Sequence, residues 1–92
     1  MPQPQSADAI VVYVQSRCDY FVVYTPKTAS FAVFEYWRGI YPSVDDALLG
    51  KVSSFGFEDL FNVTRNGTMH VWIEDYLLSE RRAADIILQK CR

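Results

Sequence analysis

The sequence predicts a mainly β (α+β) fold: a small antiparallel sheet of five or six strands, either a meander or a barrel-like sheet, with one C-terminal α-helix. Three observations support this prediction. Near the N-terminus, three runs of β-branched and aromatic residues follow one another, separated by short polar connectors. Residues 57–75 then carry apolar runs on either side of an Asn-Gly step, which is typical of a hairpin. Finally, apolar residues close to the C-terminus recur at helical spacing.

A chain of 92 residues accommodates one hydrophobic core. Hydrophobic residues make up 50% of it, so we expect a compact fold that requires neither a metal ion nor a disulfide. Residues 1–8 are polar and contain two prolines, which predicts a disordered N-terminal tail. Residues 9–92 are predicted to form a single domain.

The strands are expected at about residues 9–15, 19–25, 30–38, 47–55, 57–64 and 68–75. In the first three strands both faces are apolar, so the second face must be covered by another layer, by barrel closure or by a partner. The segment 43–50 is ambiguous. Ser43 and Asp46 resemble the capping box of a short helix that would end at Gly50, but so short a run slightly favours a strand.

The C-terminal helix is predicted over about residues 80–91. Ser79 is a favourable N-cap residue. One apolar stripe follows at helical spacing, formed by Ala84, Ile87, Leu88 and Cys91. We expect this stripe to dock on the sheet.

The Asn-Gly step predicts the pairing of the last two strands. A two-residue turn at Asn66 and Gly67 would place Phe61 opposite Trp72, and other apolar residues would also face one another.

The same register brings four carboxylates together at the open end of the hairpin. Asp59 would face Glu74, and Glu58 would face Asp75, which is unfavourable unless something compensates the like charges. Four interpretations remain open. The strands splay and the carboxylates are solvated; the four residues form a divalent-cation site; a carboxylate pair performs acid–base chemistry; or the cluster is an acidic docking patch for a basic partner.

The two cysteines, Cys18 and Cys91, lie near opposite ends of the chain. They could form a disulfide only if the fold brought their Cα atoms within about 7 Å. The N-terminal segment does not resemble an export signal, and no apolar run is long enough to cross a membrane. We therefore expect a cytoplasmic protein that has two free thiols and does not interact with membranes.

The sequence contains no pattern typical of catalysis. His70 is the only histidine and is expected to be a partly buried structural residue, while Cys18 has no identifiable base. No glycine-rich phosphate loop occurs. We predict no catalytic residue, no cofactor and no enzyme activity, and the residues resemble no characterised family.

The segment EYWRGIYP is the strongest candidate for a binding surface. It gathers residue types that are frequent in binding hot spots, namely Tyr36, Trp37, Arg38 and Tyr41. We expect a non-catalytic interaction or regulatory module that binds another protein or a second copy of itself. One alternative is a small barrel that stacks on single-stranded nucleic acid, which the net charge of −2 disfavours. The other is a cation-binding or minor enzymatic site at the acidic end of the hairpin.

Overall fold

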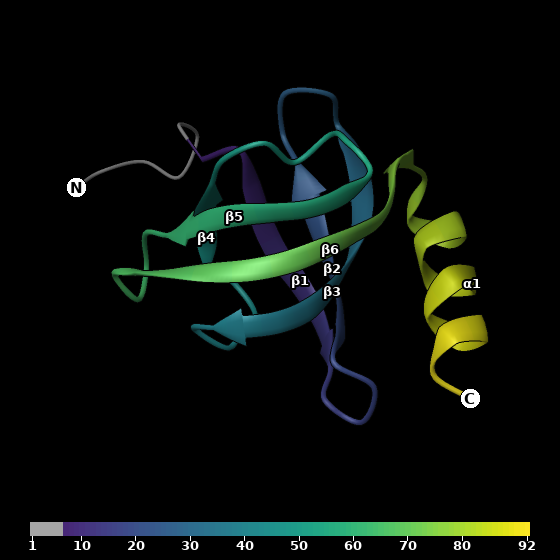
Figure 1. Ribbon diagram of the computed structural model, residues 1–92. Coiled ribbons are helices and arrows are strands. Elements are labelled where there is room, and N and C mark those ends of the chain that lie inside the picture. The colour runs from purple at the N-terminus through teal and green to yellow at the C-terminus, as the bar shows by residue number, and fades with distance from the viewer. Residues whose placement is uncertain (1–6) are drawn as a thin grey trace.

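The computed structural model describes residues 7–92, which form six strands and one helix (Figure 1). The elements are β1 (Ala9–Gln15), β2 (Tyr20–Thr25), β3 (Ser30–Gly39), β4 (Ala47–Leu49), β5 (Gly56–Asn62), β6 (Gly67–Leu78) and α1 (Glu80–Lys90). Every pair of neighbouring strands is antiparallel, and the sheet closes into a barrel in the order β1-β2-β3-β6-β5-β4. The predicted fold class is confirmed, in its barrel form.

The barrel consists of two three-stranded meanders, β1-β2-β3 and β4-β5-β6. Pairing of β3 with β6 joins them on one side, and pairing of β1 with the short strand β4 closes the other. Closure matters because an open sheet would leave unpaired backbone groups along its edges.

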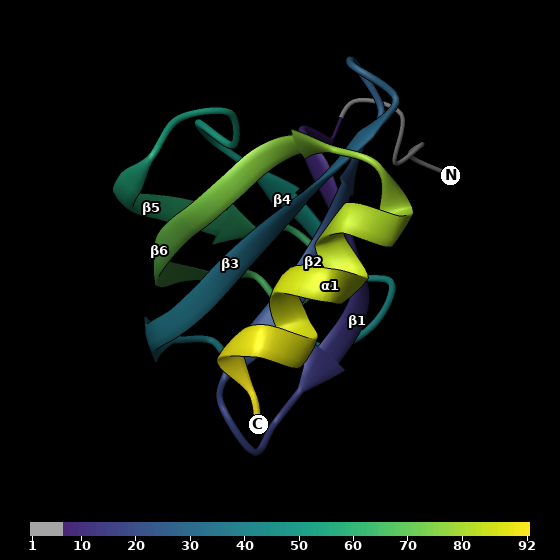
Figure 2. The ribbon, with the colours of Figure 1, turned by 90° about the vertical axis from the view of Figure 1, so that its right-hand side faces the viewer.

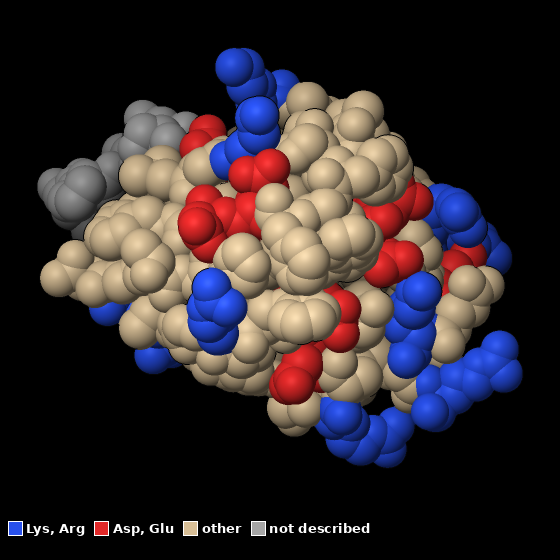
Figure 3. All heavy atoms as spheres, viewed as in Figure 1, with Lys and Arg blue, Asp and Glu red and all other residues tan. Residues whose placement is uncertain are grey.

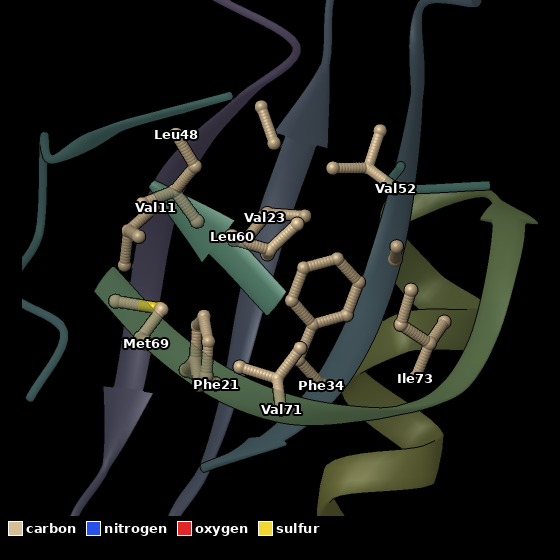
Figure 4. Close-up of a cluster of buried hydrophobic side chains, with 12 residues drawn as sticks. Val11, Phe21, Val23, Phe34, Leu48, Val52, Leu60, Met69, Val71 and Ile73 are labelled. Atoms are coloured by element: carbon tan, nitrogen blue, oxygen red, sulfur yellow. The ribbon is translucent and has the colours of Figure 1, made fainter. Parts of the chain in front are cut away.

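Apolar side chains from all of these strands fill the barrel interior (Figure 4). Phe21 and Phe34 lie at its centre, fully buried, with their rings edge to face and their centroids 5.5 Å apart. Barrel closure therefore shields one apolar face of the first three strands, as one of the sequence-based alternatives proposed.

Helix α1 covers part of the outer face of β2 and β3 (Figure 2). Its buried residues are Ala83, Ile86 and Ile87, which pack against Val22 and Val33 of the sheet. As predicted, Ser79 is the N-cap, and its side-chain oxygen accepts a hydrogen bond from the backbone N–H of Arg82 at 3.1 Å.

The prediction that the apolar stripe of the helix docks on the sheet is wrong for two of its four residues. Ala84 and Leu88 are exposed, and Leu88 is 71% exposed. Ala83, Ile86 and Ile87 form a second apolar set one residue earlier, with the same i, i+3, i+4 spacing, and periodicity alone does not choose between the two. Packing of Ala83 and Ile86 on the sheet selects the other stripe.

The prediction of two free thiols is also wrong, because Cys18 and Cys91 form a disulfide. Their Cα atoms are 5.4 Å apart, although the residues are separated by 73 positions in the sequence. Cys18 lies in the β1–β2 turn and Cys91 is the C-cap of α1. Docking of the helix on β2 and β3 is what brings these two distant positions together.

Two predicted boundaries differ from the structure near β4. Ala7 and Asp8 belong to the predicted tail but pack on the barrel: Ala7 is buried, and the Asp8 N–H donates to the Leu48 carbonyl at 2.9 Å. Residues 1–6 of the predicted tail lie outside the described residues. The segment 43–50 contains no helix but a turn followed by β4, which is three residues long and much shorter than the predicted 47–55.

The predicted register of the β5–β6 hairpin is wrong. Asn62 pairs with Gly67, so a four-residue loop over 63–66 replaces the expected two-residue turn. Trp72 consequently faces Phe57 instead of Phe61.

A buried polar network explains this register. Asn62 is fully buried, and its side-chain carbonyl accepts a hydrogen bond from the backbone N–H of Arg65 at 3.0 Å, which fixes the loop. Its side-chain amide donates to Asp46 Oδ2 at 2.9 Å, and Arg65 Nε donates to the same oxygen at 3.0 Å. A tight turn at Asn66 and Gly67 would pair Asn62 elsewhere and leave Asp46 buried without these partners.

Candidate functional site

The observed register does not bring the four carboxylates of the hairpin together. Asp59 faces His70 and Glu58 faces Val71. Successive residues of a strand point to opposite faces. Asp59 accordingly projects from the outer face, where its carboxylate contacts His70 Nδ1, while Glu58 accepts a hydrogen bond from Ser54 Oγ at 3.3 Å.

Glu74 and Asp75 have other neighbours. Glu74 forms an ion pair with Lys90 of the helix at 3.2 Å, whereas Asp75 lies opposite Val33. Within residues 7–92, no group of three or more His, Cys, Asp or Glu side chains could hold a metal ion. The like-charge pairing that suggested a cation site is therefore not the pairing of the structure.

Glu74 also takes part in the contact between barrel and helix. Burial, together with the nearby charges of Glu35 and Glu74 and a hydrogen bond to Glu74, raises the pKa of Tyr20 from 10.0 to about 12. Tyr20 belongs to the apolar cluster beneath α1. Glu74 thus lies near Tyr20 of the sheet and is paired with Lys90 of the helix.

Two of the predicted binding residues, Tyr36 and Tyr41, make contacts within the fold. Their rings are edge to face, with centroids 4.8 Å apart. The Tyr36 hydroxyl donates to the Gly39 carbonyl at 2.7 Å, and the Tyr41 hydroxyl donates to Asp19 Oδ1 at 3.0 Å. They fix the end of β3 against the β1–β2 turn.

Trp37 lies on the outer face of β3 and belongs to a row of rings that crosses three strands. Its ring is edge to face with that of Phe57 on β5, at a centroid distance of 5.0 Å. Phe57 also contacts Trp72 of β6 at 4.8 Å and stacks on His70 at 5.1 Å, with an interplanar angle of 11°. We call Trp37, Phe57, His70 and Trp72 the aromatic strip.

Two members of the aromatic strip are exposed, while His70 and Trp72 are partly buried. Trp37 is 53% exposed and Phe57 is 47% exposed, although both contact other rings. The barrel interior is filled by different residues, so these two rings are not part of the main core. Exposed clusters of large apolar side chains often mark interaction sites.

Carboxylates accompany the aromatic strip. Trp37 Nε1 donates to Glu35 Oε1 at 3.3 Å, and Glu35 lies opposite Trp72 in the β3–β6 pairing. Figure 3, viewed from the side of β5 and β6, shows Asp and Glu among uncharged surface, whereas Lys and Arg lie mostly toward its edge. Arg38, the fourth predicted binding residue, is exposed at the end of β3.

Sequence reasoning found Trp37 but missed Phe57, His70 and Trp72 as members of the site. The sequence did contain a pattern that could have indicated them. Phe57 and Asp59 are two positions apart and therefore lie on the same face of a strand, which places an aromatic ring beside a carboxylate. The incorrect register concealed it by placing Phe61 opposite Trp72.

A second exposed apolar feature lies elsewhere on the outer face of the barrel, beside α1. A groove of about 740 Å³ runs between α1 and the outer face of β1 and β2, lined by residues that include Ile10, Val12 and Leu88. Helix α1 covers β2 and β3 but leaves this part of β1 open. Nothing in the structure indicates what would occupy the groove.

No family model, curated protein or solved structure matches the chain. Over residues 7–92, no helix is long and apolar enough to cross a membrane.

Proposed function

We propose that this protein is a non-catalytic protein-interaction module whose binding surface is the aromatic strip. The observation that carries the proposal is the exposure of Trp37 and Phe57 on a barrel whose interior is already filled by other side chains. Trp is among the residues most enriched in binding hot spots, and large rings desolvate easily. The proposal keeps Trp37 from the sequence-based candidates and replaces Tyr36 and Tyr41 with Phe57 and Trp72.

The partner is either another protein or a second copy of this chain. A closed barrel offers no edge strand for pairing, which supports recognition through side chains on the outer face.

The cytoplasmic location remains a prediction. The Cys18–Cys91 disulfide favours an oxidising compartment instead, because thiols in the cytosol are generally kept reduced.

The test compares proteins captured by three tagged versions of the chain after chemical cross-linking in native lysate. They are the wild type, the double variant Trp37→Thr/Phe57→Thr, and the control Leu88→Gln. Threonine retains a preference for strands, and glutamine retains a preference for helices, so both changes remove exposed apolar surface with little effect on local structure. Leu88 lies in the separate groove beside α1.

We expect wild type and Leu88→Gln to enrich the same partner and the double variant to lose it, as measured by quantitative mass spectrometry. Size-exclusion chromatography of the same samples identifies the case in which the partner is a second copy. Equal capture by the double variant would refute the proposal, and loss of capture by Leu88→Gln alone would assign binding to the groove.

A further inference from the structure

We propose that the aromatic strip binds an arginine-containing basic segment of its partner, with guanidinium groups stacking on the rings and pairing with the adjacent carboxylates. This inference rests on the proposed function and specifies the chemistry of the partner. It is carried by the juxtaposition of exposed rings with carboxylates on one face of the barrel.

Glu35 provides the first such juxtaposition. It is two residues before Trp37 on β3, accepts the hydrogen bond from the Trp37 indole through Oε1, and lies opposite Trp72 on β6. Its carboxylate is thus adjacent to two indole-bearing residues. A guanidinium that stacks on an indole face here can also form a charge-assisted hydrogen bond to Glu35.

Asp59 provides the second juxtaposition of a carboxylate with an aromatic ring. It is two residues after Phe57 on the same outer face of β5 and contacts His70, which stacks on Phe57. The Asp59 side chain is 78% exposed, so it remains accessible to a ligand. The combination of ring and carboxylate therefore occurs twice on this surface.

The chemistry of these groups favours arginine over other ligands. Its guanidinium is planar, stacks on aromatic rings and forms paired hydrogen bonds with a carboxylate. A purely apolar partner would cover Glu35 and Asp59 without satisfying them, which is costly. Nucleic acid would bring phosphates against the same carboxylates, and the chain carries a net charge of −2.

The charges of Glu74 and Arg38 help to predict which substitutions should change binding of the basic segment. Glu74 is paired with Lys90, so we expect its charge to contribute less than those of Glu35 and Asp59. Arg38 lies opposite His70 in the β3–β6 pairing, where its charge opposes a basic ligand. Removing Glu35 or Asp59 should therefore weaken binding, whereas removing Arg38 should strengthen it.

The experiment uses a fluorescein-labelled peptide of alternating glycine and arginine, with a matched peptide in which citrulline replaces each arginine. Citrulline preserves the shape of the side chain and removes its charge. Fluorescence anisotropy with the full-length wild-type protein should show that the arginine peptide binds about tenfold more tightly at low salt. The difference should shrink at high salt, which screens exposed charges.

The variants are measured with the arginine peptide. We expect Glu35→Gln and Asp59→Asn each to weaken binding by about three- to fivefold, and Arg38→Gln to strengthen it by a similar factor. Trp37→Thr should weaken binding by about tenfold or more. Leu88→Gln, outside the strip, should leave the affinity unchanged.

The possible failures are distinguishable. Equal binding of both peptides, with continued dependence on Trp37, would overturn the basic partner and leave the proposed function standing. Binding of neither peptide would also overturn this inference, and the capture experiment would then decide the proposed function by itself. If a labelled oligothymidylate bound more tightly than the arginine peptide through Trp37, nucleic acid would replace the basic segment.

Discussion

At the residue scale, a single buried carboxylate determines how the second half of the barrel pairs. Asp46 is 2% exposed and accepts hydrogen bonds from the Asn62 amide, from Arg65 Nε and from the backbone N–H of Ser43. Ser43 belongs to the β3–β4 connection, whereas Asn62 and Arg65 belong to the β5–β6 hairpin, so the network holds these two segments together. A buried polar group is tolerated only when it is satisfied in this way.

Replacing Asp46 tests this role. Asp46→Ala leaves the fully buried Asn62 amide without its acceptor, and we expect the free energy of unfolding to fall by about 2–3 kcal/mol. Denaturant unfolding measures the change. The control is Asp85→Ala, at an exposed helical position, which should alter stability by no more than about 0.5 kcal/mol. Equal effects of the two substitutions would contradict the role of Asp46.

Tyr20 should make the stability of the folded protein depend on alkaline pH. Its pKa is raised to about 12 in the folded protein, foremost by burial, against 10.0 without the fold. Above pH 10 the unfolded chain therefore loses this proton while the folded chain retains it, which favours unfolding. The stabilising contribution is complete below pH 10 and is lost as pH rises toward 12.

We therefore expect the stability of the wild type to fall more steeply between pH 10 and pH 12 than that of Tyr20→Phe, which has no phenolic proton at this site. Urea unfolding at a series of pH values gives both slopes. The remaining tyrosines are common to the two proteins, so the difference isolates Tyr20. Parallel slopes would show that Tyr20 titrates normally.

At the element scale, helix α1 is held on the barrel at both of its ends. Its first turn follows Leu78 of β6, and its C-cap Cys91 is bonded to Cys18 in the β1–β2 turn. Between them, Ala83, Ile86 and Ile87 bury one face of the helix. Helices of this length depend on such tertiary contacts for their stability.

The disulfide should contribute strongly, because it closes a loop of 73 residues in the unfolded chain. We expect Cys91→Ser to lower the free energy of unfolding by about 2–4 kcal/mol. A reducing agent should produce the same loss in the wild type and none in the Cys18→Ser/Cys91→Ser double variant. An unchanged melting temperature of the wild type under reduction would contradict this expectation.

Some features of the strands and the helix could be predicted from the sequence, and others could not. The three N-terminal strands and the capped helix were predicted closely, because β-branched runs and an N-cap are local signals. The hairpin register and the buried helix stripe were not. Both depend on contacts between distant residues, such as that of Asn62 with Asp46, and no local pattern encodes those contacts.

At the scale of the whole molecule, barrel closure separates residues that fold the chain from residues available for binding. Phe21 and Phe34 fill the interior, while Trp37 and Phe57 remain on the outside. Composition showed that aromatic residues were abundant, and Trp37 was identified as a candidate. Its true neighbours could not be predicted, because they come from β5 and β6 and depend on the register.

The measurement that tests this separation most directly is the free energy of unfolding of Trp37→Thr/Phe57→Thr, set beside that of the core variant Phe34→Ala. We expect each strip substitution to cost about 1 kcal/mol or less, because the rings are half exposed. Phe34→Ala should cost about 3–5 kcal/mol. If the double variant lost as much stability as Phe34→Ala, the aromatic strip would be part of the folding core, and its role as a binding surface would be contradicted.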